Sequence, residues 1–195
     1  MAMIHLVDDD EAVTSACSYL LESLGHSVRC WNKSEQFLHE APLDTTGVAL
    51  LDMRMPEMDG HALFQAMREA HSTLAVIFLT GHGDVPMAVQ EIQSGAVDFL
   101  QKPVAAGALK AAIEKGFAHS ARLTQTNDLR LRYATLTPKE KEVAHCVAAG
   151  LMNKDIALKM HIALRTVEVH RARVMEKMDA KSMAELVMQI NRSGA

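Results

Sequence analysis

The chain has 195 residues, of which 49% are hydrophobic and 23% are charged, so it is long enough for two modest domains. Its three cysteines, Cys17, Cys30 and Cys146, are odd in number and widely spaced, which argues against a disulfide framework or a structural zinc site. The N-terminus passes straight into a strand-like run, and no apolar run approaches the roughly 20 residues that span a bilayer. We therefore expect no signal peptide, no membrane partner and a cytoplasmic location.

The charge is divided unevenly along the chain. Residues 1–133 hold 10 Lys and Arg against 17 Asp and Glu, whereas residues 134–195 hold 10 against 7. An acidic first part followed by a basic second part is typical of a cation-binding module joined to a nucleic-acid binder. Chance variation between two ordinary domains remains an alternative on this observation alone.

Strand-like segments alternate with helical ones through the first 120 or so residues. The strands are expected at Met3–Val7, Ser27–Trp31, Val48–Asp52, Leu74–Leu79 and Val97–Leu100, and the helices at Glu11–Leu24, Ser34–Glu40, His61–Ala70, Met87–Gln93 and Val104–Ala118. This alternation predicts an α/β fold with a five-stranded, doubly wound parallel sheet of the flavodoxin-like kind. The sequence has no Gly-x-Gly-x-x-Gly after the first strand and no Gly-x4-Gly-Lys-Ser/Thr, the two glycine-rich motifs that bind nucleotide phosphates. A nucleotide site is therefore not supported.

Polar residues stand where four of these strands end. Asp8 and Asp9 follow the first strand, Asp52 ends the third, Thr80 follows the fourth, and Lys102 comes shortly after the fifth. The carboxyl ends of parallel strands share one edge, where three acids would repel one another unless a cation such as Mg²⁺ lay among them. Taken singly, a strand-end Asp is usually a turn former or a helix cap, and a Lys before Pro is usually solvated. Their joint placement favours a site for Mg²⁺ and a phosphoryl group.

These residues lie in recognisable motifs, namely Val7-Asp8-Asp9, Leu51-Asp52-Met-Arg-Met-Pro56-x-Met-Asp-Gly60, Thr80-Gly-His-Gly-Asp-Val-Pro and Phe99-x-x-Lys102-Pro103. Together they resemble the receiver domain of bacterial two-component response regulators, which has a CheY-like fold, and in particular the FixJ branch. The resemblance implies that Asp52 is the phosphoacceptor. It also implies a Mg²⁺ site formed by Asp9, Asp52 and the backbone carbonyl of Arg54, which Asp8 supports through water.

The same resemblance implies a conformational switch. Lys102 would pair with one phosphoryl oxygen and Thr80 would hydrogen-bond another, while Phe99 would turn inward once Thr80 shifts. The face formed by residues 85–94, 97–100 and 104–118 would then change and pair two copies of the chain.

A polar segment and four short helical patterns follow. Residues 116–133 could extend the preceding helix or form a flexible spacer, and the sequence does not decide between them. Thr137-Pro-Lys-Glu140 is a capping box with Pro at the first helical position, and it predicts a helix start. The helices are expected at about 137–150, 153–160, 164–178 and 181–191. Short helices joined by tight turns are typical of a helix-turn-helix unit.

The third of these helices has an apolar face on Val167, Val174 and Met178, which could belong to any amphipathic helix. A helix with basic flanks after a short turn also suits a reader of the DNA major groove. The segment Leu136-Thr-Pro-x-Glu140, Gly150-Leu-x-Asn153-Lys-x-Ile156-Ala157, Thr166-Val167-Glu-Val-His170 and Lys177-Met178 resembles the LuxR/NarL-type DNA-binding domain. The resemblance places bases against Glu168, Val169 and Ala172, and phosphates against Lys154, Arg165, Thr166, Arg171, Arg173 and Lys177.

We therefore expect a receiver domain at residues 1–120, a linker at 121–134 and a LuxR-type helix-turn-helix domain at 135–195. The predicted function is phosphorylation-controlled transcription regulation, with Mg²⁺ as cofactor and no enzymatic activity on other substrates. The predicted partners are a sensor histidine kinase, double-stranded promoter DNA, a second copy of the chain and RNA polymerase. Two alternatives stay open: a Mg²⁺-dependent phosphatase that uses the same acids, and DNA binding that does not depend on phosphorylation.

Overall fold

The computed structural model describes residues 3–81 and 91–193 of the chain. The chain folds as two compact units, Met1–Thr124 and Gln125–Ala195. Across the described ranges, none of the helices combines the length and apolar character needed to cross a membrane. The predicted domain boundaries at residues 120 and 135 stay a prediction.

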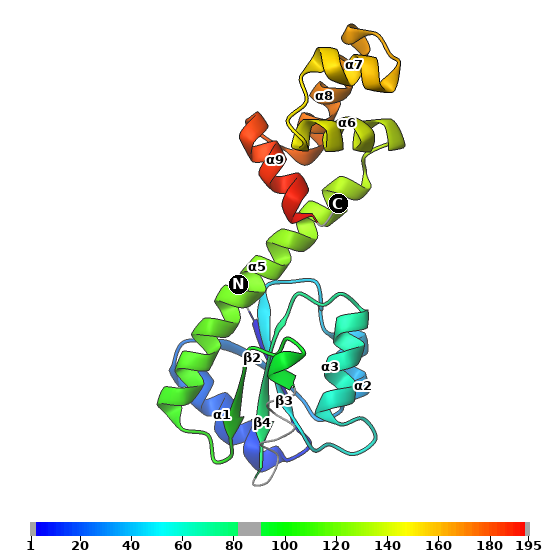
Figure 1. Ribbon diagram of the computed structural model, residues 1–195. Helices are drawn as coiled ribbons and strands as arrows, with labels where there is room; N and C mark the ends of the chain where they lie inside the picture. The colour runs from blue at the N-terminus through cyan, green and yellow to red at the C-terminus, as the bar shows by residue number, and fades with distance from the viewer. Residues whose placement is uncertain (1–2, 82–90, 194–195) are drawn as a thin grey trace. The chain divides into compact units, whose positions relative to one another are not determined.

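The first unit is built on a five-stranded parallel sheet in the order β2-β1-β3-β4-β5 (Figure 1). The strands are β1 (Met3–Val7), β2 (Ser27–Trp31), β3 (Gly47–Asp52), β4 (Ala75–Thr80) and β5 (Asp98–Gln101). The described helices of this unit are α1 (Glu11–Ser23), α2 (Ser34–Glu40), α3 (Gly60–Glu69) and the first part of α5 (Ala106–Ala134). The predicted doubly wound α/β fold is confirmed.

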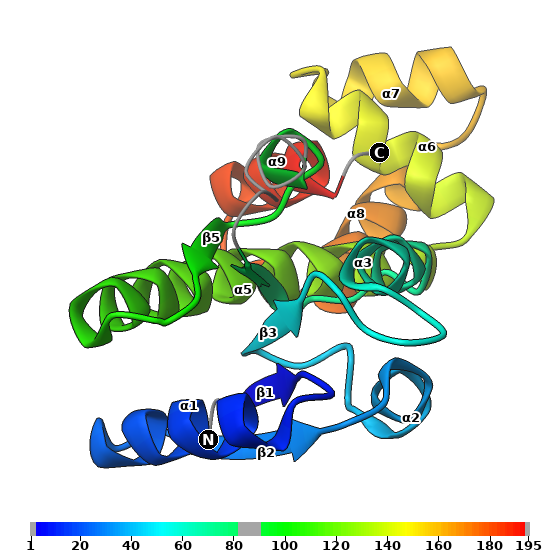
Figure 2. The same cartoon turned by 90° about the horizontal axis from the view of Figure 1, so that it is seen from below.

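Helices cover both faces of this sheet, with α1 and α5 on one side and α2 and α3 on the other (Figure 2). Side chains of a strand alternate between its faces, so neighbours in β3 enter different cores. Leu50 packs with the α1 and α5 side chains, whereas Leu51 packs with those of α2 and α3. Every residue of β3 and β4 is buried, as expected for central strands covered on both faces.

Helix α5 is longer than the predicted helix at Val104–Ala118, because it continues to Ala134 through the polar segment. Its polar side chains find partners at the amino ends of the strands. Ser120 is fully buried; its hydroxyl donates to the Thr73 carbonyl at 2.6 Å and accepts from the Gly47 amide at 3.0 Å. The segment left open by the sequence is therefore helical.

Two of the predicted helices differ in detail from the structure or are only partly described. The helix predicted at Ser34–Glu40 is present as α2; its N-cap residue is Lys33, and the Ser34 hydroxyl donates to the Met58 carbonyl at 2.8 Å. Most of the helix predicted at Met87–Gln93 lies outside the described residues. Its last part, from Glu91, is described and is helical.

The second unit is helical, with the end of α5 followed by α6 (Pro138–Ala148), α7 (Asn153–Met160), α8 (Leu164–Met178) and α9 (Met183–Arg192). The predicted capping box at the start of α6 is present, since the Glu140 amide donates to Thr137 Oγ1 at 3.3 Å and the Thr137 amide donates to Glu140 Oε2 at 2.8 Å. Apolar side chains of all four helices meet in one core, which includes Val143, Ile156, Val174 and Leu186.

Candidate functional site

Three carboxylates meet at the carboxyl edge of the sheet. One oxygen from each of Asp8, Asp9 and Asp52 lies within 4.8 Å of the others. They come together because β1 and β3 are neighbours in register, with Val7 beside Leu51. Asp8 and Asp52 are 1% and 6% exposed, whereas Asp9 is open to solvent. The arrangement predicted from the strand ends is therefore present.

The ammonium of Lys102 lies between two of these acids. Its Nζ is 2.6 Å from Asp8 Oδ2 and 2.6 Å from Asp52 Oδ1. Lys102 reaches them from the end of β5, where its amide donates to the Thr80 carbonyl at 2.8 Å. Burial lowers the pKa of Lys102, but its hydrogen bonds to Asp52 and Asp8 outweigh burial, and the pKa is raised. Lys102 thus stays charged and offsets part of the acidic cluster.

The Asp52 carboxylate has its second oxygen held by the backbone, since the Arg54 amide donates to Oδ2 at 2.9 Å. Burial raises the pKa of Asp52, and the hydrogen bond and charge of Lys102 oppose this rise. A buried carboxylate with one oxygen at an ammonium and the other at an amide is fixed in orientation, as a nucleophile requires.

The turn after Asp52 depends on a glycine. Asp59 caps α3 by accepting from the Ala62 amide at 2.8 Å, so this acid has the structural role that a strand-end Asp usually has. A Cβ on the next residue, Gly60, would lie 2.2 Å from the Asp52 carbonyl oxygen. Helix α3 therefore starts against the backbone of Asp52, and no larger residue fits there.

We predict that Gly60→Ala destabilises the first unit by about 1–3 kcal/mol, the usual cost of overpacking, because the clash is with a backbone atom that cannot easily move. Gly107→Ala in α5 is the matched control, because a Cβ there meets nothing within 4 Å and should stabilise the helix by up to about 1 kcal/mol. Urea unfolding followed by the fluorescence of Trp31, the only tryptophan, measures both variants. Equal stability of the two variants would contradict the prediction.

Thr80 and Phe99 lie on adjacent strands close to this cluster. Thr80 is 1% exposed, and its hydroxyl donates to the Leu100 carbonyl on β5 at 3.5 Å. Phe99 pairs in register with Phe78 and packs, partly buried, against the core beneath α2 and α3. The structure thus places both predicted switch residues at the same side of the sheet, and their role in switching stays a prediction.

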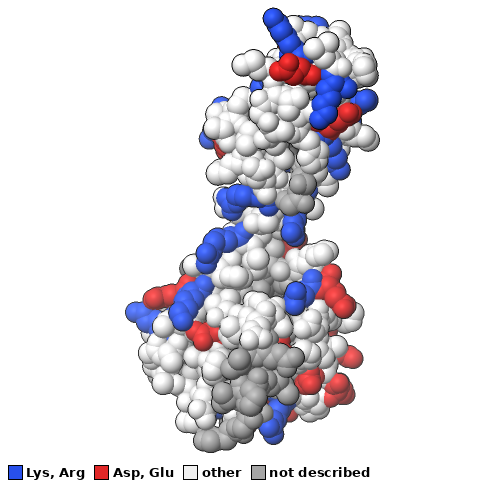
Figure 3. Space-filling view, viewed as in Figure 1, with Lys and Arg blue, Asp and Glu red and all other residues white. Residues whose placement is uncertain are grey.

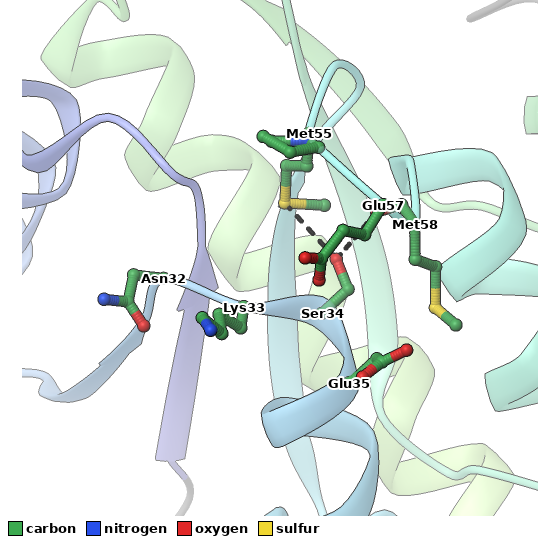
Figure 4. A pocket seen from close by; sticks show the side chains of 8 residues that line it. Asn32, Lys33, Ser34, Glu35, Met55, Glu57 and Met58 are labelled. Carbon is green, nitrogen blue, oxygen red and sulfur yellow. Dashed lines mark hydrogen bonds between the residues drawn. The ribbon is translucent and has the colours of Figure 1, made fainter.

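A shallow pocket of about 110 Å³ lies beside the loop that follows Asp52 (Figure 4). Its lining comes from that loop and the start of α2, namely Asn32, Lys33, Ser34, Glu35, Met55, Pro56, Glu57 and Met58. The hydroxyl of Ser34 holds the two walls together through the Met58 carbonyl and lies 3.6 Å from Met55 Sδ. None of the three acids lines this pocket, so the carboxylate cluster is a separate site.

In the second unit, α8 presents a polar face opposite its buried residues. Val167, Val174 and Met178 are fully buried. The residues predicted to face bases, Glu168, Val169 and Ala172, are all exposed. A helix with one buried face and one exposed face can pack against its own domain and still present a row of side chains to the major groove of DNA.

The predicted phosphate contacts fall into two groups. Lys154, Arg165, Thr166 and Arg173 are exposed, and Figure 3 shows Lys and Arg spread over the visible face of this unit with acids among them. Arg171 is instead held inside the domain, where its guanidinium contacts Asn153 Oδ1 on α7 and Met183 Sδ on α9.

Lys177 is also engaged within the domain. Its Nζ lies 2.7 Å from Glu140 Oε2 and 3.1 Å from the Thr135 carbonyl. Glu140 is 2% exposed, and the hydrogen bond from Lys177 is the main reason that its pKa falls from 4.5 to about 2. The pair joins α6 to the end of α8.

Comparisons with known proteins assign a family to each of the two units. Residues 4–114 match the family described as "Response regulator receiver domain", and residues 134–190 match "Bacterial regulatory proteins, luxR family". The chain is 57% identical, over 98% of its length and 93% of the relative's, to the tetrathionate response regulatory protein TtrR of Salmonella typhimurium.

It is 43% identical to the transcriptional regulatory protein FixJ of Rhizobium meliloti, over 94% of this chain and 92% of that one. The chain is a two-component response regulator of the FixJ type. A solved structure of the response regulator StyR aligns with a TM-score of 0.71 at 35% identity and covers 98% of each chain. The response regulator therefore combines a receiver domain with a LuxR-type DNA-binding domain.

Sequence reasoning missed two supporting residues of this response regulator. Asp10 had no predicted role, yet it caps α1 by accepting from the Ala12 amide at 2.8 Å. An Asp directly before a helical pattern was the available signal. Asn153 was treated as a helix start, and nothing in the sequence pairs it with Arg171, because the two residues lie on different helices.

Proposed function

We propose that Asp52 accepts a phosphoryl group from a phosphohistidine on a sensor kinase. Its carboxylate oxygen attacks phosphorus, the P–N bond breaks as the O–P bond forms, and an acyl phosphate remains on Asp52. The observation that carries this proposal is the contact of Lys102 with Asp8 and Asp52, in a chain that also has a LuxR-type domain. Lys102 would offset charge on the phosphoryl oxygens, and Thr80 would donate to one of them once it moves from Leu100.

Mg²⁺ fits the three acids. They offer hard oxygen ligands within 4.8 Å of one another, which is the donor set that this ion prefers. Asp9, Asp52 and the Arg54 carbonyl would hold it, with Asp8 in support. When bound, Mg²⁺ would offset the negative charge that gathers on the transferring group.

Phosphorylation would be read by the surface beside β5. Movement of Thr80 and Phe99 would alter the face formed by residues 85–94, β5 and the start of α5, and this face would pair two copies of the regulator. Residues 85–90 of that face lie outside the described part of the chain. Two paired copies would bring two DNA-binding domains to a two-half-site operator, from which they would act on RNA polymerase in the cytoplasm.

The proposed regulator has no catalytic activity on external phosphoesters. The regulator is expected to receive its phosphoryl group from a sensor histidine kinase. Its similarity to the tetrathionate response regulatory protein makes a tetrathionate-responsive kinase the first one to test.

The experiment is phosphorylation of the full-length regulator by acetyl phosphate, followed by intact mass, dimerisation and operator binding. We expect Mg²⁺ to raise the rate of phosphorylation on the order of 100-fold over EDTA, because the metal supplies several kcal/mol of charge stabilisation. We also expect the phosphorylated form to dimerise and bind a two-half-site duplex more tightly. Full affinity without the donor would support the phosphorylation-independent alternative, and multiple turnover on phosphoesters would support the phosphatase.

A further inference from the structure

The exposed face of α8 carries an acid where it would meet DNA. The side chain of Glu168 is 44% exposed, and its Oε2 lies 3.2 Å from Nη1 of Arg165, whose side chain is 86% exposed. An isolated carboxylate on such a face would be repelled by phosphates. The neighbouring guanidinium compensates for that charge and leaves the other carboxylate oxygen, Oε1, able to accept a hydrogen bond.

Two small apolar side chains stand beside this acid. Val169 is 38% exposed, and Ala172 is exposed one turn further along the helix. Arg165, Glu168, Val169 and Ala172 are spaced i, i+3, i+4 and i+7, so they share one face of α8. The carboxylate and the apolar pair would therefore face adjacent positions of a bound duplex.

Two arginines lie close to Glu168, and their contacts differ: Arg165 pairs with the Glu168 carboxylate, whereas Arg171 is engaged within the domain. An Arg commonly reads guanine through both acceptors of its edge. Arg171 is held by Asn153 and Met183, on the flank of α8 that packs against α7 and α9. The carboxylate of Glu168, paired with Arg165 at one end of the face, and the apolar pair Val169 and Ala172 therefore form its centre.

We infer that Glu168 specifies a C·G base pair by accepting from the N4 amino group of cytosine, and that Val169 and Ala172 contact the methyl group of a neighbouring thymine. This inference rests on the proposed DNA-binding function. In the major groove guanine offers only acceptors, thymine offers an acceptor and a methyl group, and adenine places its N7 acceptor next to its amino group. Cytosine itself offers only a donor, its N4 amino group, and a carboxylate is an acceptor without a donor, so Glu168 would favour cytosine.

The test is selection of binding sites from a randomised duplex library by the full-length regulator, with acetyl phosphate and Mg²⁺ present. The wild type should enrich half-sites with an invariant C·G pair next to a T·A pair. Glu168→Gln should shift that position to A·T, because an amide suits the N6 and N7 groups of adenine. Its affinity for the C·G site should fall on the order of ten-fold.

Glu176→Gln is the matched control, since Glu176 is exposed near the other end of the same helix and should leave base preference unchanged. Replacing the enriched thymine by deoxyuridine removes its methyl group. This change should weaken the wild type several-fold and Val169→Ala much less.

The outcomes separate two failures. If the phosphorylated wild type enriches no sequence, the proposed DNA-binding function fails, and this inference fails with it. If a site is enriched but Glu168→Gln leaves its base preference unchanged, or weakens all sites equally, the regulator binds DNA and the inference about Glu168 is wrong. A wild-type preference for another base at the position that responds to Glu168→Gln would also overturn it.

Discussion

Asp52→Asn is expected to abolish the gain in dimerisation and DNA affinity that a phosphoryl donor produces. The amide keeps the shape of the carboxylate and can still accept from the Arg54 amide, but it lacks the charged nucleophile that forms the acyl phosphate. The fold should survive, because Lys102 retains its contact with Asp8 and one charge leaves a crowded acidic cluster. Intact mass after incubation with acetyl phosphate, and operator affinity with and without it, measure the effect.

The matched control is Asp59→Asn in the same loop. Asp59 caps α3 from an exposed position, and Asn is an equally good N-cap, so this variant should be phosphorylated like the wild type. A phosphoryl group that still appears on Asp52→Asn, together with an undiminished rise in DNA affinity, would show that another residue is the acceptor.

Glu140→Gln is expected to lower the free energy of unfolding of the DNA-binding unit by about 2–3 kcal/mol. The pKa of Glu140, lowered from 4.5 to about 2, indicates a stabilising interaction of roughly this size at pH 7. Gln can still complete the capping box with Thr137, so the loss reports chiefly the charge pair with Lys177. Loss of helical circular dichroism in urea, before Trp31 fluorescence changes, would locate the effect in the second unit.

The pH dependence of this effect has a defined sign. Because the folded-state pKa of Glu140 lies below its unfolded value, the contribution is complete above pH 4.5 and is lost as the pH falls from 4.5 towards 2. The gap between the wild type and Glu140→Gln should therefore close across that interval. If the difference in free energy of unfolding between the two proteins stayed constant from pH 7 to pH 3, the loss would be due to packing and not to the charge of Glu140.

Glu142→Gln on the same helix is the control for surface charge. Glu142 pairs with Lys139 at 3.2 Å, but the two side chains are 47% and 58% exposed. Such a pair contributes little, so we expect a change below about 0.5 kcal/mol.

Much of the receiver fold follows from local patterns in the sequence. The unbroken apolar run before Asp52 becomes a central strand buried on both faces, and the residue types at the strand ends predict an acidic edge. The capping box at Thr137 predicts the start of α6 from four residues alone. These features could be predicted from the sequence because each depends on residues that are close together in the chain.

Contacts between distant residues could not be read in this way. No pattern around residue 120 indicates that its serine hydroxyl is buried against Thr73 and Gly47, at the amino ends of β4 and β3. Similarly, Arg171 and Lys177 have the composition of phosphate contacts, yet both bind groups on other helices. Long polar side chains can turn to solvent, to DNA or to the protein, and tertiary packing decides which.

The sequence by itself determined the family and the doubly wound sheet, and it named the residues that are proposed to carry the chemistry, because strand ends and helix starts are marked by local residue types. The tertiary structure decided the geometry within that set. It placed the Lys102 ammonium between Asp8 and Asp52, turned the Thr80 hydroxyl towards Leu100, and left Glu168 rather than Arg171 on the exposed face of α8. The physical reason is that hydrogen bonds between side chains depend on distances in space, which the order of residues does not contain.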